Sequence, residues 1–263
     1  EESVFTEQGT TSEGSNELLQ LFRLELFPNP KPVSLISHLL GFSVGKDDLI
    51  LDFFAGSGTT AHAVLEMNRQ DGGNRRFILV QLPEPVEGAQ KEQFPTISAI
   101  TRERVRRVIA QMNGQEAQPN VPPDRDRGFK AFTLSSSNFK IWDSSKAAQT
   151  EAELAEQLRL FADHTVEGRT SQDMLYEILL KAGLPLTADV RQLEIGGKCV
   201  YSVHDGALLV YVEKEIAAEQ LRAMIDRKPM HIICLDEAFF GNDPLKTNAV
   251  LEMKSHGIGF RTV

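Results

Sequence analysis

The segment LDFFAGSGTT, residues 51–60, decides the fold of the first part of this chain. An apolar run ends at the acidic Asp52 and is followed directly by two closely spaced glycines, Gly56 and Gly58. The residues after them place apolar side chains at i, i+3 and i+4, starting from Ala61, which is the period of a helix. The segment therefore predicts a strand, a glycine turn and a helix, which is half of a βαβ unit.

The surrounding sequence extends this α/β pattern. Residues 17–40 read as two helices separated by PNPKP at 28–32, because proline interrupts a continuous helix. The run RRFILVQL at 75–82 is almost continuously apolar, as expected for a parallel strand covered on both faces. Residues 97–112 then read as a helix rich in arginine. A doubly wound, Rossmann-like sheet is the predicted fold class.

A polar, proline-rich segment at 114–128 divides the chain. We therefore predict a first domain over 1–113, a linker over 114–128, and a smaller α/β domain over 129–263. Asp205-Gly206 is a strong hairpin signal within the second domain. The strands predicted there are 128–134, 139–142, 189–195, 198–203, 207–213, 231–235 and the C-terminal residues, and the helices are 151–162, 171–182, 217–225 and 245–256.

The bulk composition excludes several classes of protein. With 41% hydrophobic and 25% charged residues among 263, and no apolar run of membrane-spanning length, we expect no membrane association. The start of the sequence has no signal-peptide pattern, and Cys199 and Cys234 have no metal-ligand spacing. We therefore expect a cytoplasmic protein without a metal site. A net charge of −9 argues against a chain that grips nucleic acid along its whole surface.

The glycine segment is compatible with more than one ligand. Residues 56–61 satisfy the dinucleotide pattern G-x-G-x-x-G/A, but a pyrophosphate bound there would be repelled by the carboxylate of Asp52. A P-loop is excluded because the sequence has no G-x-x-x-x-G-K-[ST]. An acid at this position suits a ligand with cationic groups, such as S-adenosylmethionine. The alternative is that the glycines only form a tight turn and that Asp52 is a solvated strand end.

Three stretches resemble a known family: FPNPKPVSLISHLL (27–40), DDLILDFFAGSGTTAHAVLEMNR (47–69) and RRFILVQLPEP (75–85). They closely resemble amino-methylating DNA methyltransferases with the permuted β order of motifs, in particular the modification (Mod) subunits of type III restriction–modification systems. Residues 129–142 and the ending, with residues 235–250 and 260–263, are similar to the C-terminal region of that subunit. The resemblance implies part of an S-adenosylmethionine-dependent methyltransferase sheet followed by an assembly domain.

The same resemblance implies a function and partners. The full enzyme would transfer a methyl group from S-adenosyl-L-methionine to adenine N6 in double-stranded DNA, and would assemble with a second Mod subunit and the restriction (Res) subunit. The cofactor site would consist of twelve residues from three segments. These are Lys31, Pro32, Asp52, Phe53, Ala55, Gly56, Ser57, Gly58, Thr59, Thr60, Gln81 and Glu84.

Several of these residues have a plainer alternative role. The resemblance places Asp52 near the ammonium of the cofactor and Lys31 near its carboxylate, although Lys31 also fits an ordinary solvated lysine. The hydroxyl of Thr60 would equally serve the start of the following helix. Gln81 stands where the family offers an acid to the ribose hydroxyls, and a glutamine gives a weaker bond there. Glu84 either takes over that contact or is a loop acid.

The catalytic segment of the family has no counterpart in this sequence. Adenine methylation needs a D-P-P-[YFW] segment that holds the flipped base, and NVPPD at 120–124 departs from it at two positions. In the permuted order this segment and the target-recognition region precede PKPV. We therefore expect this chain to be the C-terminal part of a longer enzyme and name no catalytic residue.

We expect ordinary structural roles for two further features of the sequence. The arginines of TRERVRRVI could contact DNA phosphates, but their interleaving with apolar residues favours the solvated face of an amphipathic helix. His62 is expected to be a packed helix residue and not a base. Those arginines are Arg102, Arg104, Arg106 and Arg107.

Overall fold

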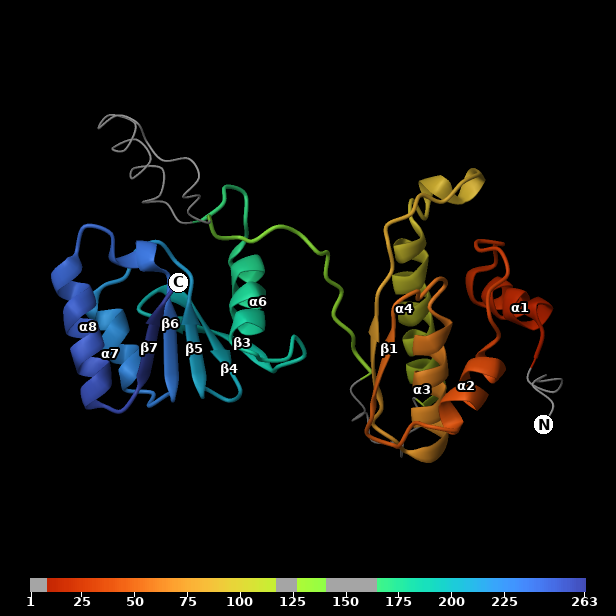
Figure 1. Ribbon diagram of the computed structural model, residues 1–263, viewed down its shortest axis with the longest axis horizontal. Coiled ribbons are helices and arrows are strands. Elements are labelled where there is room, and N and C mark those ends of the chain that lie inside the picture. The colour runs from red at the N-terminus through yellow and green to blue at the C-terminus, as the bar shows by residue number, and fades with distance from the viewer. Residues whose placement is uncertain (1–8, 117–126, 141–164) are drawn as a thin grey trace. The chain divides into compact units, whose positions relative to one another are not determined.

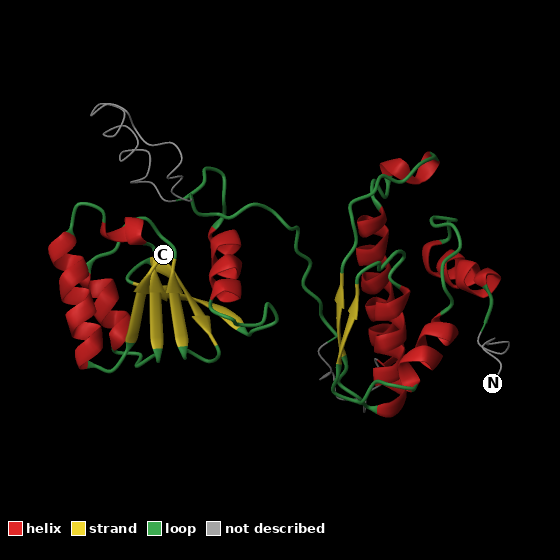
Figure 2. Ribbon diagram, viewed as in Figure 1, coloured by secondary structure: helices red, strands yellow, loops and turns green. Residues whose placement is uncertain are grey.

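The computed structural model describes residues 9–116, 127–140 and 165–263. The chain divides into two compact units, residues 1–131 (unit 1) and residues 132–263 (unit 2), and each contains helices and a separate sheet (Figures 1 and 2). This mixed α/β architecture confirms the predicted α/β class. None of the described helices combines the length and the apolarity needed to cross a bilayer.

Unit 1 is built around the predicted βαβ unit. Strands β1 and β2 pair in parallel, with Leu49 opposite Arg76 and Asp52 opposite Leu79, and α3 connects them. The described elements are α1 (Thr11–Phe22), α2 (Val33–Gly41), β1 (Leu49–Asp52), α3 (Thr59–Asp71), β2 (Arg76–Leu79), the 3-10 helix η1 (Ala89–Glu92) and α4 (Ile97–Glu116).

The sheet of unit 1 is covered on one face. Phe77 and Leu79 of β2 pack with the buried side chains of α3 and α4. The alternating residues point the other way, and Leu51 is 48% exposed and Ile78 46% exposed. The expectation that strand 75–82 is covered on both faces is therefore wrong for the described residues, because both helices lie on the same side.

Unit 2 contains a five-stranded sheet in the order β3-β4-β5-β6-β7. The pairs β3–β4 and β4–β5 are antiparallel, whereas β5–β6 and β6–β7 are parallel. Every residue of β5 is buried, so both faces of the sheet are covered. Its described elements are α6 (Ser171–Lys181), β3 (Val190–Ile195), β4 (Lys198–Val203), β5 (Leu208–Tyr211), α7 (Ala218–Ile225), β6 (His231–Cys234), the 3-10 helix η2 (Asp236–Phe239), α8 (Asp243–Ser255) and β7 (Gly259–Thr262).

Some predicted elements differ from the structure. Residues 128–134 form no strand. In the predicted strand 139–142, Phe139 makes an isolated bridge to Thr165, and residues 141–142 lie outside the described residues. The predicted helix 151–162 lies outside the described residues, as does most of the predicted linker, and α4 includes the first residues of that linker, up to Glu116. The alternation of polar and apolar residues in 128–134 suggests a strand, but no neighbouring described backbone pairs with it.

Candidate cofactor-binding site

The carboxylate of Asp52 lies at the carboxyl end of β1 and faces the start of α3. One oxygen accepts a hydrogen bond from the backbone N–H of Phe54 at 2.9 Å, and the other accepts one from the Thr60 hydroxyl at 2.6 Å. Asp52 is therefore not a freely solvated strand end. The Thr60 hydroxyl donates across the turn to this carboxylate.

Two glycines shape the segment that joins β1 to the first residues of α3, residues 52–60, called here the glycine loop. Gly56 and Gly58 have φ of +52° and +81°, in the left-handed region that favours glycine. A Cβ on Gly58 would lie 3.2 Å from the side chain of Thr101 on α4, so the helix packs directly on the loop. The Thr101 hydroxyl also donates to the carbonyl of Gly56 at 2.6 Å.

Gln81, in the segment after β2, is hydrogen-bonded to the glycine loop. Its amide oxygen accepts a hydrogen bond from the N–H of Gly56 at 2.7 Å, and its amide nitrogen lies 3.5 Å from a carboxylate oxygen of Glu84. The loop after β2 and the glycine loop are thereby joined. Glu84 is exposed beside them.

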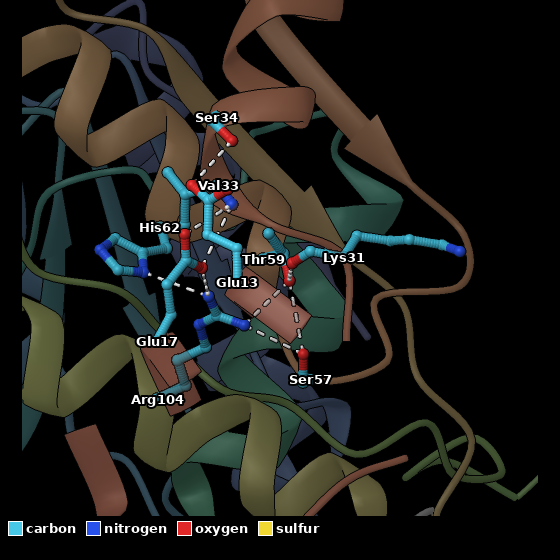
Figure 3. A network of polar contacts seen from close by, with 9 residues as sticks. All are labelled: Glu13, Glu17, Lys31, Val33, Ser34, Ser57, Thr59, His62 and Arg104. Atoms are coloured by element: carbon cyan, nitrogen blue, oxygen red, sulfur yellow. Dashed lines mark hydrogen bonds and ion pairs between the residues drawn. The ribbon is translucent and has the colours of Figure 1, made fainter. Parts of the chain in front are cut away.

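The PKP segment, residues 30–32, lies against the glycine loop. The Thr59 hydroxyl donates to the backbone carbonyl of Lys31 at 3.1 Å, while the Lys31 side chain is exposed and extends away from this contact (Figure 3). Pro32 is buried, and the N–H of Val33 at the start of α2 donates to the carboxylate of Glu17, with distances of 3.1 and 3.2 Å to its two oxygens. A residue of α1 thus caps α2.

The prediction that Arg104 lies on the solvated face of its helix is wrong. It is neither solvated nor available to DNA phosphates, because its side chain on α4 is completely buried. One guanidinium nitrogen donates to the hydroxyls of Ser57 at 3.0 Å and Thr59 at 2.8 Å. The other donates to His62 Nδ1 at 3.2 Å and to Glu17 at 3.4 Å (Figure 3).

The spacing of residues along α4 could have indicated that Arg104 is buried. Position 104 lies four residues after Ile100 and four before Val108, and both neighbours are buried, so all three share one face of the helix. The Nε of Arg104 is buried and has no hydrogen-bond partner among the described residues. Arg102 and Arg106 are exposed, as predicted, and Arg107 is partly so.

Burial sets the charge states of this network. Desolvation lowers the pKa of His62 to about 4, with a further lowering by the neighbouring Arg104. Desolvation also lowers the pKa of Arg104 to about 10, against the opposing effect of Glu17. At neutral pH, Arg104 is therefore charged and His62 neutral, with its Nδ1 accepting because arginine only donates.

The remaining predicted residues divide between the interior and the surface. Ala55 and Ser57 are buried in the loop, whereas Phe53 is 64% exposed next to Asp52. Glu84, Lys31 and Phe53 thus offer accessible side chains around the loop. The described residues contain no group of three or more His, Cys, Asp or Glu side chains placed to hold a metal ion.

Comparison with known proteins identifies the family. Residues 2–94 match the N6_N4_Mtase family, described as DNA methylase. The chain is 31% identical over 245 residues to the Mod subunit of the type III restriction-modification enzyme StyLTI of Salmonella typhimurium, covering 84% of this chain and 37% of that protein. The chain is related to the Mod subunits of type III restriction-modification enzymes.

Other relatives agree with this family. The EcoP15I Mod subunit of Escherichia coli is 32% identical over 221 residues, which cover 81% of this chain and 31% of that protein. The type II methyltransferase M.KpnI of Klebsiella pneumoniae is 41% identical over 106 residues, or 39% of this chain and 24% of that protein. The chain spans about a third of the length of the Mod subunits that it matches.

Proposed function

We propose that this chain supplies the S-adenosyl-L-methionine site of a type III DNA methyltransferase that methylates adenine N6 in double-stranded DNA. The observation that carries the proposal is the convergence of three separate segments. Hydrogen bonds from the glycine loop reach Lys31 of the PKP segment and Gln81 after β2, while the carboxylate of Asp52 lies half-buried at their junction.

The side chains at this junction fit the cofactor. Each oxygen of Asp52 accepts one hydrogen bond within the loop, and a carboxylate retains capacity for an ammonium donor. Lys31 offers a cation to the carboxylate of the methionine moiety, and the exposed ring of Phe53 offers an apolar face. When bound, the cofactor supplies the methyl group, and this chain binds and orients it.

The sequence contains no D-P-P-[YFW] segment to hold an extruded adenine. We therefore expect this chain by itself to bind the cofactor without transferring its methyl group. Binding, not turnover, is the property to measure.

Calorimetric titration with S-adenosylhomocysteine and, separately, with NAD tests the proposal. We expect binding of the first alone. Asp52→Ala should weaken it about tenfold or more, because a charge-assisted hydrogen bond is lost, with an unchanged circular dichroism spectrum. Asp48→Ala is the matched control, since Asp48 precedes β1 and its carboxylate accepts a hydrogen bond from Gly45 N–H at 2.8 Å, outside the glycine loop. Equal affinity of wild type and Asp52→Ala would remove Asp52 from the site.

The alternative is a non-catalytic subunit-assembly module with a relic cofactor loop. It is favoured by the engagement of the Asp52 oxygens and the Gln81 oxygen within the loop itself. A stable complex of this chain with a partner subunit, together with no affinity for S-adenosylhomocysteine, would support this alternative over the first proposal.

We assign unit 2 to assembly with a second Mod subunit and the Res subunit, and DNA contact to the whole enzyme. Support comes from the relatives, which are Mod subunits of multi-subunit enzymes, and from large apolar side chains exposed on unit 2, such as Phe240 and Leu251. Sedimentation of the whole chain with and without Phe240→Ser tests the assignment. A smaller particle for the variant is expected, and unchanged association would contradict a role for Phe240.

A further inference from the structure

Arg104 lies where four elements of unit 1 meet. Its guanidinium, on α4, contacts Glu17 of α1, Ser57 of the glycine loop, and Thr59 and His62 of α3. A buried arginine loses its hydration, which is a substantial cost unless its donors are satisfied. Four contacts on the two terminal nitrogens offset that cost.

The contacts form two branches that end on the same segment (Figure 3). In the first, Arg104 donates to the Thr59 hydroxyl, which donates in turn to the carbonyl of Lys31. In the second, Arg104 pairs with Glu17, which accepts from the N–H of Val33. Lys31 and Val33 flank Pro32, so the two branches hold this segment from both sides.

The geometry needs an arginine. The planar guanidinium directs donors from two nitrogens toward separate acceptors, whereas a lysine offers one compact ammonium. From the position of Arg104, a single ammonium would not reach the Ser57 and Thr59 hydroxyls together with Glu17 and His62.

We propose that Arg104 is a positioning residue for the cofactor site, which it serves without touching the cofactor. It sets the separation between the PKP segment and the glycine loop, the two pieces that carry Lys31 and Asp52. The inference rests on the proposed function for the ligand, but the ordering of the two segments can be measured without any ligand.

Arg107 provides the comparison that separates positioning from general stability. It also ties α4 to α1, since it donates to the carbonyl of Leu21 at 3.1 Å and lies over the ring of Phe22 at 4.6 Å. Its described contacts include no residue of the glycine loop or the PKP segment. Arg104→Lys and Arg107→Lys are therefore matched variants on one helix.

The first measurement is amide hydrogen exchange of the free chain. Arg104→Lys should raise exchange about tenfold or more at residues 31–34 and 54–60, because bonds to a charged group are lost, with unit 2 unchanged. Arg107→Lys should leave those residues as in wild type. Equal exchange of the two segments in wild type and Arg104→Lys would overturn the proposal, whether or not the chain binds a cofactor.

The second measurement is affinity for S-adenosylhomocysteine. Arg104→Lys should weaken binding about 10- to 100-fold, and Arg107→Lys by less than about threefold. If Arg104 acts through Thr59, the losses in Arg104→Lys and Thr59→Val should not add in the double variant, as expected for coupled residues. Additive losses would overturn that route.

Two outcomes keep the inference distinct from the proposed function. Wild type that binds no S-adenosylhomocysteine would count against the cofactor proposal, and hydrogen exchange would then decide the inference alone. If Arg104→Lys does not fold, Thr59→Val removes the first branch and Glu17→Ala removes the second, and each leaves Arg104 in place. Wild-type exchange at residues 31–34 in both variants would overturn the inference.

Discussion

The two sheets of this chain reach stability by different routes. In unit 2, one large apolar cluster joins the sheet to α6, α7 and α8. In unit 1, the buried apolar residues form two small clusters, one face of β1 and β2 is exposed, and the polar network of Arg104 links α1, α3 and α4. Unit 2 is stabilised mainly by the burial of apolar side chains, and unit 1 depends in addition on hydrogen bonds and an ion pair around its glycine loop.

The largest effect that would test this comparison comes from a core deletion in unit 2. Leu209→Ala should lower the free energy of unfolding of unit 2 by about 3 kcal/mol, because Leu209 in β5 is fully buried. Leu51→Ala, on the exposed face of β1, should cost less than about 1 kcal/mol. Urea unfolding followed by hydrogen exchange in each unit measures both, and equal costs would contradict the contrast.

Most of the strands and helices in both units could be predicted from residue patterns. The period of apolar residues and the glycine turn indicated β1, α3 and β2, and the hairpin signal at Asp205-Gly206 indicated the β4–β5 pair. Coverage of the sheet was not predictable, because an apolar strand such as 75–82 has the same composition whether one face or both are packed. The prediction of a strand at 128–134 was wrong for a related reason, since a strand must pair with a neighbouring strand that the local sequence does not specify.

The candidate site shows the same limit. The turn at Gly56 and Gly58 and the position of Asp52 at the end of β1 could be predicted, because short motifs specify local backbone conformation. Arg104 was misassigned because arginines are mostly exposed, although its place between Ile100 and Val108 marked the buried face. Its acceptors lie on α1, on α3 and in the glycine loop, far away in sequence, and only the fold brings them together.

The next effect concerns the anionic partner of Arg104. Glu17→Ala should lower the free energy of unfolding of unit 1 by about 2 to 3 kcal/mol, since a buried guanidinium loses its counter-charge and α2 loses its cap. Glu13→Ala is the control on the same helix, because Glu13 bonds the Ser34 hydroxyl at 3.3 Å in an exposed position. Thermal unfolding measures both, and a loss for Glu13→Ala as large as for Glu17→Ala would refute the role of the buried pair.

The smallest effect is the pH dependence contributed by His62. Its pKa is lowered to about 4 in the folded chain by burial and by Arg104, whereas an unfolded histidine titrates near 6.5. Between these values the unfolded state binds a proton that the folded state does not. The contribution to stability is therefore present above about pH 6.5 and is lost as the pH falls toward 4.

We expect this histidine to lower the free energy of unfolding by about 1 to 2 kcal/mol between pH 7 and pH 5. The charged groups that face it are Arg104 and Glu66, and Arg69 holds the pKa of Glu66 below its usual range. His62→Gln keeps an acceptor for Arg104 but cannot be protonated in this range. Its unfolding free energy, from urea titrations at several pH values, should decline less than that of wild type toward pH 5, and parallel curves would show that His62 does not titrate as a buried neutral partner of Arg104.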